Sequence, residues 1–319
     1  MRLVFLGSPA FAVPSVEALQ EAGHEVGLVV TQPDRPAGRG QKSTPPPVAA
    51  YARDHGLEVW QTSSLRGPEA EQRLRAVGAE AMALAAFAAL VPGNILHLTP
   101  GGILNVHPSL LPRWRGAAPI QAALLAGETE TGVSIMRLVQ AMDAGPILLQ
   151  ERVPIAESDD YLTLEPRLAA LGARLLVRAL AEQPPPHAQD ETRATYCQRI
   201  ARDDGRIDWS APAVRIWNQV RAYRAWPQAF TTFQSRELKV LRSWPISVSP
   251  EGGGDSAEAT APAMPGTVTI LDGSPIVSTG RGLLRLDEVQ LEGRRAQAGA
   301  EFVRGHPRLV GAVLSGSVA

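Results

Sequence analysis

The sequence predicts an α/β protein in two parts, a doubly wound and mostly parallel sheet followed by a smaller β-barrel. The chain opens with a strand–helix–strand pattern, which favours a right-handed crossover between parallel strands. Buried apolar runs then alternate with helical patterns as far as residue 180. After residue 205 the pattern changes to short strands and turns, a rhythm that suits a small barrel and that spacing alone does not distinguish from a sandwich.

The opening unit begins with Arg2–Gly7, an apolar strand that runs into a glycine turn. A helix follows from Ser8 or Pro9, with apolar residues at helical spacing as far as Ala22. Val26–Val30 is the second strand. One glycine follows the first strand, so the G-x-G-x-x-G pattern is missing and a dinucleotide site is not supported.

Further helices and strands complete the first part. Helices are expected over 48–55, 70–77, 120–125 and 164–180, and strands over 81–86, 102–106 and 132–138. Thr31–Pro47 is rich in glycine and proline, and it is expected to be a loop that orders on binding rather than a helix or strand.

Domain boundaries follow from these changes of pattern. Gln183–Pro186 stops the long helix with three consecutive prolines. We therefore expect a first domain over residues 1–188, a polar linker over 189–205 and a C-terminal barrel over 206–319. Three tryptophans of the C-terminal part, Trp209, Trp217 and Trp226, are expected in its core.

Composition limits the function classes. The chain holds 31 Lys and Arg against 32 Asp and Glu, so the molecule as a whole is not an electrostatic nucleic-acid binder. Residues 206–319 hold 13 Lys and Arg against 10 Asp and Glu, which favours a basic surface on the C-terminal half. One cysteine, Cys197, excludes an internal disulfide. No apolar run is long enough for a membrane span and no signal-peptide pattern is present, so a cytoplasmic protein is expected.

The most informative stretch is Asn105–Ile120. Gly102–Val106 has the pattern of a short buried strand, along which side chains alternate faces, so Asn105 and His107 point the same way when both are extended. Pro108 then ends the pairing because it has no N–H. An amide and an imidazole are therefore expected side by side where a strand opens into a loop, the place where ligands bind in open α/β sheets.

This pair suits acyl transfer. An asparagine amide donates to a developing oxyanion, and a histidine moves a proton near neutral pH. Asp143 follows the strand expected over Gly132–Leu138 and is the candidate carboxylate partner. Each residue alone also has a structural interpretation, since an aspartate before Ala-Gly is an ordinary turn residue. The combination of the asparagine, the histidine and the aspartate favours a catalytic site for acyl transfer.

Asn105–Ile120 resembles the signature of the 10-formyltetrahydrofolate-dependent formyltransferases, and residues 109–120 have the form found in members that act on methionyl-tRNA. Thr31–Gly40 is similar to the loop of those members for the tRNA acceptor end. Ile207–Trp209 and Arg221–Pro227 resemble the start of their C-terminal domain. The resemblance covers nearly the whole chain. It implies a formyltransferase Rossmann-like catalytic domain and an OB-like, tRNA-binding barrel.

The activity implied by this resemblance is formyl transfer from 10-formyltetrahydrofolate, the co-substrate, to the free α-amine of initiator methionyl-tRNA, for translation initiation. Asn105 and His107 would stabilise the oxyanion, and Asp143 would hold His107. The implied folate-binding residues are Phe87, Leu90, Val91, Ser109, Leu110, Leu111 and Pro112. The implied tRNA-binding residues are Arg35, Arg39 and Lys42. No metal is implied, no H-x-x-x-H or H-E-x-x-H pattern occurs, and a monomer is expected.

Alternatives remain open at this point. A formyltransferase for a small amine, such as a nucleotide sugar or glycinamide ribonucleotide, would need neither the basic 35–42 loop nor the barrel. A folate hydrolase, or the hydrolase domain of a formyltetrahydrofolate dehydrogenase, is the second alternative, although the chain is too short to carry the dehydrogenase part. A noncatalytic RNA-binding protein is the least favoured, because the Asn, His and Asp are all present.

Overall fold

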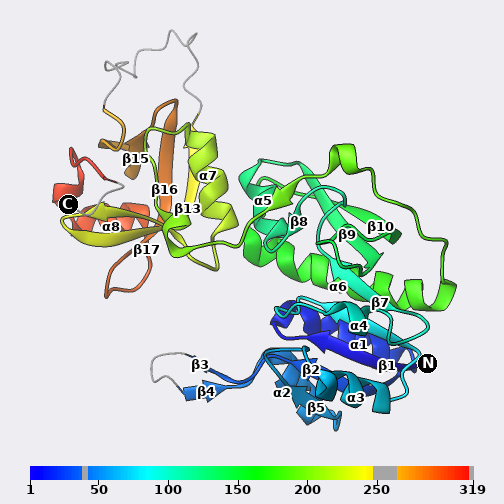
Figure 1. Ribbon diagram of the computed structural model, residues 1–319. Helices are drawn as coiled ribbons and strands as arrows, with labels where there is room; N and C mark the ends of the chain where they lie inside the picture. The colour runs from blue at the N-terminus through cyan, green and yellow to red at the C-terminus, as the bar shows by residue number, and fades with distance from the viewer. Residues whose placement is uncertain (38–41, 247–263, 316–319) are drawn as a thin grey trace. The chain divides into compact units, whose positions relative to one another are not determined.

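The computed structural model describes residues 1–37, 42–246 and 264–315 (Figure 1). The chain divides into two compact units, and each consists of several segments. Unit 1 comprises Met1–Ile120, Thr129–Ala156 and Thr163–Gln198. Unit 2 comprises Gln121–Glu128, Glu157–Leu162 and Arg199–Ala319.

Unit 1 is built on a seven-stranded sheet with the strand order β10-β9-β7-β6-β1-β2-β5. Its strands are β1 (Arg2–Gly7), β2 (Glu25–Thr31), β5 (Val59–Gln61), β6 (Ala81–Ala85), β7 (Ile103–His107), β9 (Glu130–Arg137) and β10 (Ile147–Pro154). The pairs from β7 to β5 are parallel, whereas β9 runs antiparallel to β7 and β10 antiparallel to β9. The predicted mostly parallel sheet is confirmed.

Helices lie on both faces of this sheet. The helices of unit 1 are α1 (Val13–Glu21), α2 (Pro47–Asp54), α3 (Pro68–Ala76), α4 (Gly93–Leu96) and α6 (Tyr161–Glu182), with the 3-10 turns Ala10–Ala12 and Glu191–Arg193. α5 (Pro119–Leu125) crosses the division between the units, because Gln121–Glu128 belong to unit 2. Leu74 of α3 and Ile95 of α4 pack with Leu6 of β1 in one buried apolar cluster. Gly172 of α6 lies against Val106 of β7, because a Cβ at that glycine would come within 2.4 Å of the valine side chain.

Strand alternation assigns the site residues to one of these faces. In the β1–β6–β7 register, Leu6 pairs with Leu84 and Leu84 pairs with Asn105. Paired residues share a face, so Asn105 points to the side covered by α3 and α4, and Val106 points to α6. The arrangement is doubly wound, as predicted.

The 31–47 segment contains a short hairpin that the sequence analysis did not predict. β3 (Arg35–Ala37) pairs antiparallel with β4 (Lys42–Thr44), and Arg35 lies opposite Thr44. The expectation of a segment without regular structure was wrong for its described part. Each strand is three residues long, too short for an alternating pattern, and glycine and proline mark hairpin turns as well as loops.

Unit 2 contains an antiparallel sheet with the order β12-β13-β16-β15-β14, and β17 pairs with β16. Its elements are β12 (Ala229–Phe233), β13 (Arg236–Ile246), β14 (Val268–Leu271), β15 (Ser274–Ser278), β16 (Leu283–Leu291), β17 (Gln297–Ala298), the helices α7 (Ala213–Ala222) and α8 (Gly299–Gly305), and the 3-10 turns Arg202–Gly205 and Pro307–Leu309.

The segment 311–315 joins the two edges of this sheet. On one side Val268 donates its backbone N–H to Ala312 and accepts that of Gly311, both at 2.9 Å. On the other side Thr232 of β12 donates to Ser315, also at 2.9 Å. The strands therefore close on themselves, and the predicted small barrel is confirmed.

Two of the three tryptophans expected in the C-terminal core contribute to it. Trp209 is buried and donates its indole N–H to Thr231 at 3.0 Å, and Trp217 packs partly buried against the same cluster. Trp226 is 53% exposed, so the expectation was wrong for this residue. None of the helices in the described ranges has the length and apolar character that crossing a membrane requires.

Candidate active site

Asn105 and His107 lie at the carboxyl end of β7, and β7 ends at His107 immediately before Pro108. Their side chains are buried, with 6% of Asn105 and 4% of His107 exposed. Since they are two residues apart on one strand, they share a face, as the sequence predicts. The strand therefore holds an amide and an imidazole rigidly where it opens into the loop that follows.

Hydrogen-bond acceptors face both nitrogens of the His107 ring. Nε2 lies 3.0 Å from the backbone oxygen of Trp114. A carbonyl only accepts, so Nε2 carries a hydrogen in this contact. Nδ1 lies 3.8 Å from Oδ2 of Asp143. The orientation of the ring is thus set by a backbone carbonyl on one side, and its second nitrogen faces a carboxylate.

Asp143 reaches the site from the loop between β9 and β10. Its Oδ2 accepts the backbone N–H of Gly116 at 2.8 Å and is the oxygen that faces His107. Gly116 has φ +118°, and a Cβ there would meet the carbonyl oxygen of Cys197 at 2.2 Å. Only glycine fits this position. The structure therefore brings together the three residues that the sequence singled out for chemistry.

The Asn105 amide, unlike His107 and Asp143, makes no hydrogen bond to another described residue. Among the hydrogen bonds between described residues, none involves its side chain, and 6% of the residue is exposed. The amide atoms are not among the fully buried polar atoms that lack a hydrogen-bond partner, so they keep some exposure to solvent at the strand end. An amide held beside His107 without an internal partner is suited to donate to a bound substrate.

Polar groups inside the signature loop hold the loop itself. The Ser109 side chain is fully buried, and its hydroxyl donates to the Arg113 carbonyl at 2.6 Å. The backbone N–H of Leu111, also buried, donates to the Ser134 hydroxyl at 3.1 Å. Leu110 and Pro112 are half-buried.

Ser134 and Gln150 support this loop, and the sequence analysis missed both. Gln150 Nε2 donates to the Ser134 hydroxyl at 2.8 Å and to the Leu111 carbonyl at 3.0 Å. Ser134 in turn donates to the Ser109 carbonyl at 2.7 Å. A lone serine among the apolar residues of a buried strand was the signal that could have revealed the first of them.

The three residues of the 87–92 loop that the resemblance implies for folate binding, Phe87, Leu90 and Val91, lie in different environments. Phe87 and Val91 pack partly buried against the apolar cluster beneath α3 and α4. Leu90 is 66% exposed. Of the three, Leu90 is therefore the side chain most open to a ligand.

The basic residues of the 35–42 loop are only partly described. Arg35 is exposed, and its guanidinium donates to the Gln32 side chain at 3.3 Å. Lys42 is the first residue of β4. Arg39 lies outside the described residues.

Arg115 has a structural partner set that could not be assigned from the sequence. It is 1% exposed, and its guanidinium binds both carboxylate oxygens of Glu191 at 2.7 and 2.8 Å. Nε and Nη2 donate to Oε1 of Gln189 at 3.0 and 2.8 Å. These groups come from the first half of the predicted linker, and residues 189–198 belong to unit 1.

The 189–198 segment also pairs with the signature loop through its backbone. β11 (Tyr196–Cys197) runs parallel to β8 (Arg115–Gly116). Thr195 accepts the backbone N–H of Trp114 with its hydroxyl at 2.9 Å and that of Arg115 with its carbonyl at 2.9 Å. The segment is thus a strand added to the active-site loop. Burial raises the pKa of the Cys197 thiol, which disfavours the reactive thiolate.

Acid should loosen this segment. The hydrogen bond from Arg115 lowers the pKa of Glu191 below its ordinary value of 4.5. A lowered folded-state pKa gives stability that is present above pH 4.5 and is lost as pH falls through the lowered value. Glu191→Gln should therefore lower Tm at neutral pH and flatten its fall in acid. Thermal scans at pH 2.5–7 check this, with exposed Glu58→Gln as control; parallel curves for Glu191→Gln and wild type would contradict it.

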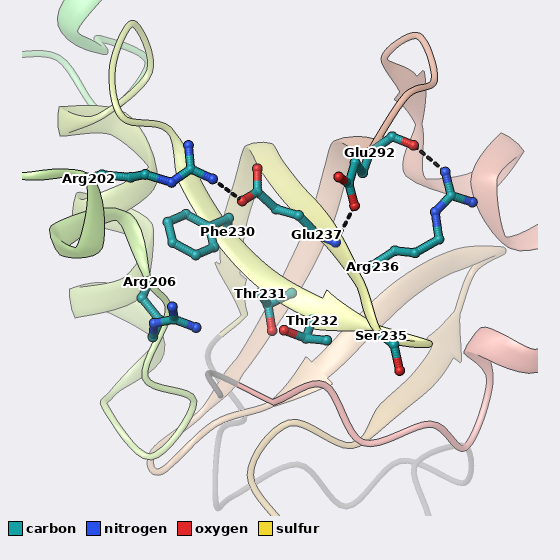
Figure 2. Close-up of a pocket in the computed structure, with 9 residues that line it drawn as sticks. All are labelled: Arg202, Arg206, Phe230, Thr231, Thr232, Ser235, Arg236, Glu237 and Glu292. Carbon is teal, nitrogen blue, oxygen red and sulfur yellow. Dashed lines mark hydrogen bonds and ion pairs between the residues drawn. The ribbon is translucent and has the colours of Figure 1, made fainter. Parts of the chain in front are cut away.

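Unit 2 carries a cavity of about 290 Å³ that three arginines and two glutamates line, Glu237 and Glu292 being the acidic residues (Figure 2). The guanidinium groups of Arg202 and Arg206 lie 5.6 and 5.2 Å from the centre of the Phe230 ring. Arg236 lines the same cavity, and Arg202 is paired with Glu237 at 2.6 Å. Arginines beside an aromatic ring suit phosphate and base contacts. Within the described residues, no group of three His, Cys, Asp or Glu side chains is placed to hold a metal ion.

Comparison with known proteins agrees with this arrangement. Residues 1–180 match the formyl transferase family, and residues 199–307 match the formyl transferase C-terminal domain. A methionyl-tRNA formyltransferase of Solibacter usitatus (strain Ellin6076) is 44% identical over 310 residues, which cover 96% of each chain. A second, from Anaeromyxobacter sp. (strain K), is 45% identical over 312 residues, which cover 96% of this chain and 97% of the relative.

A solved structure shares the fold. The N-formyltransferase of Helicobacter canadensis, solved with folinic acid and dTDP-3-aminofucose, has a TM-score of 0.63 and 19% identity, and the match covers 89% of this chain and 98% of that chain. Since a family match covers more than half of the sequence and curated relatives match over nearly their full length, the chain belongs to the formyl transferase family of enzymes, in the branch of the methionyl-tRNA formyltransferases.

Proposed function

We propose that the protein transfers the formyl group of 10-formyltetrahydrofolate to the free α-amino group of initiator methionyl-tRNA. The observation that carries the proposal is the buried group of Asn105, His107 and Asp143 at the carboxyl end of β7, in a chain with methionyl-tRNA formyltransferases as relatives. The proposed setting is a cytoplasmic monomer that binds a folate and a tRNA and takes part in translation initiation.

The amide of Asn105 is proposed to stabilise the charge that develops in the first step. The methionyl amine attacks the formyl carbon and forms a tetrahedral intermediate, whose oxygen becomes an oxyanion. An amide that the strand end holds in place, with no hydrogen bond to another described residue, is preorganised to donate to that oxygen, since no internal hydrogen bond has to break. A positively charged His107 ring beside it would add to the stabilisation.

His107 is proposed to manage the proton in the second step. The attacking nitrogen becomes an ammonium and gives up one proton, while N10 of the folate takes one as its bond to the formyl carbon breaks. The imidazole suits this transfer near neutral pH, directly or through water. Its Nε2 stays bound to the Trp114 carbonyl, so the proton that moves is assigned to Nδ1, which faces Asp143.

The identity of the amine acceptor is inferred from residues other than Asn105, His107 and Asp143. The same fold occurs in the Helicobacter canadensis enzyme solved with an amino sugar nucleotide, so the fold leaves the acceptor open. The basic 35–42 loop and the arginine-lined cavity of unit 2 favour an RNA acceptor. Arg35, Arg39 and Lys42 are the proposed tRNA contacts in the loop.

Arg39→Ala tests the acceptor and the loop together. We expect kcat/KM for methionyl-tRNA to fall by about tenfold or more, because a phosphate or base contact is lost. The Kd for the folate and the slow hydrolysis of 10-formyltetrahydrofolate should not change. Arg66→Ala, which removes an exposed arginine outside the loop, is the matched control.

The wild-type protein decides between the alternatives in the same assay. Formyl transfer to free small amines as efficient as transfer to methionyl-tRNA would support a small-amine enzyme instead. Release of formate without transfer would support a hydrolase. Unchanged activity of Arg39→Ala on methionyl-tRNA would remove the loop, though not the reaction, from the proposal.

A further inference from the structure

The Gln189 side chain connects a buried arginine to the loop that carries Asp143. Its Oε1 accepts from Nε and Nη2 of Arg115 at 3.0 and 2.8 Å. Its Nε2 donates to the backbone carbonyls of Asp143 at 2.8 Å and Gly145 at 2.6 Å. One half-buried amide thus makes four hydrogen bonds, two on each side.

These four bonds allow a single orientation of the amide. A guanidinium only donates, and a backbone carbonyl only accepts, so the oxygen must face Arg115 and the nitrogen must face the two carbonyls. A carboxylate of the same shape would satisfy Arg115 but would set an acceptor against both carbonyls. Glutamine is the side chain of this length that suits both sides.

Gln189 binds the backbone of the turn that determines where the Asp143 side chain lies. Asp143 has φ +48°, a left-handed conformation that costs a non-glycine residue free energy and needs external support. Gly145 is packed so closely that a Cβ would meet the Arg137 carbonyl oxygen at 1.8 Å. The Gln189 amide donates two hydrogen bonds to the carbonyls of residues 143 and 145, and these bonds stabilise the turn that carries the Asp143 side chain.

Arg115 anchors Gln189 from the other side. It is itself fixed by the paired hydrogen bonds to the carboxylate of Glu191, and it also donates to the Tyr196 hydroxyl at 3.5 Å. The arginine belongs to the signature loop, whereas its partners belong to the 189–198 segment. A continuous set of contacts therefore runs from Glu191 through Arg115 and Gln189 to the Asp143 turn.

We infer that Gln189 is a positioning residue for formyl transfer, which sets the Asp143 carboxylate against the His107 ring. The expected effect of Gln189 on kcat rests on the proposed function. The contacts of Gln189 with Arg115 and with the Asp143 turn do not depend on which amine accepts the formyl group. Its four hydrogen bonds go to Arg115 and to the backbone of residues 143 and 145, so Gln189 acts on His107 through Asp143.

Gln189→Glu tests the inference with a nearly isosteric change. We expect kcat for methionyl-tRNA to fall by about tenfold to a hundredfold, with KM for the folate changed by less than about threefold, because a small displacement of a catalytic group lowers the rate more than binding. Gln189→Met, which keeps the size but has no amide, should give a smaller loss. Gln183→Glu makes the same change at an exposed position after α6 and should leave kcat unaltered.

A double-mutant cycle separates positioning from general destabilisation. If Gln189 acts through Asp143, Gln189→Glu should reduce kcat little further in an Asp143→Asn background. A full, multiplicative loss in that background, or unchanged kcat in the single variant, would overturn the inference. Thermal scans of both Gln189 variants identify a folding defect.

A measurement on the protein without substrate tests the positioning role independently of the proposed function. The ¹⁵N signals of His107 report the hydrogen-bonding environment of its ring nitrogens without any substrate, and the Nδ1 signal should differ between Gln189→Glu and wild type because Asp143 faces Nδ1. Identical His107 ¹⁵N signals in the two proteins would refute the positioning role. A wild-type protein inactive on methionyl-tRNA would refute the proposed function and leave the His107 result standing.

Discussion

His107→Ala is expected to lower kcat by roughly two to four orders of magnitude, the usual scale for losing a group that moves a proton and stabilises an oxyanion. The imidazole lies buried at the end of β7 with a carbonyl at one nitrogen and the Asp143 carboxylate facing the other. Alanine removes the ring that is proposed to move the proton and to stabilise the oxyanion together with the Asn105 amide, so the chemical step should suffer most.

Folate binding provides the test of this interpretation. The Kd for 10-formyltetrahydrofolate, measured on the same preparation, should change little, because the ring is proposed to face the formyl group. His97→Ala replaces an exposed histidine and should behave as wild type. The alanine also leaves the Trp114 carbonyl without its donor, so Tm must be recorded alongside kcat. Wild-type turnover in a folded His107→Ala protein would make His107 structural.

Asp143→Asn is expected to lower kcat by about a hundredfold. The amide is nearly isosteric with the carboxylate, and its oxygen can still accept the Gly116 N–H, so the turn should keep its shape. What the variant loses is the negative charge that faces Nδ1 of His107 at 3.8 Å. The effect should therefore fall on proton transfer.

The pH dependence of kcat checks this reasoning. The profile of Asp143→Asn should differ in shape from that of wild type, since a carboxylate no longer faces the ring that is proposed to move the proton. Asp54→Asn makes the same change at an exposed position at the end of α2 and should leave both kcat and its profile as they are. An unaltered profile for Asp143→Asn would remove Asp143 from the catalytic group.

The sequence pattern was sufficient to predict those features of the fold that depend on residues close together in the chain. The end of β7 is such a case, because Pro108 cannot continue a strand and alternation places Asn105 and His107 on one face. The parallel opening of the sheet follows similarly from a strand–helix–strand pattern. The antiparallel placement of β9 and β10 carried no comparable signal, since strand order depends on packing between distant segments.

Sequence by itself therefore determined the fold class, the family and the three residues of the candidate site, because periodicity, proline and a continuous signature are local properties. Tertiary structure alone decided how these residues are held. Gln189 and Glu191 lie 74 and 76 positions from Arg115, and a polar segment after three prolines has the composition of a linker. Its role as a strand on the active-site loop arises only when hydrogen-bonding groups that are distant in sequence become neighbours in the folded chain.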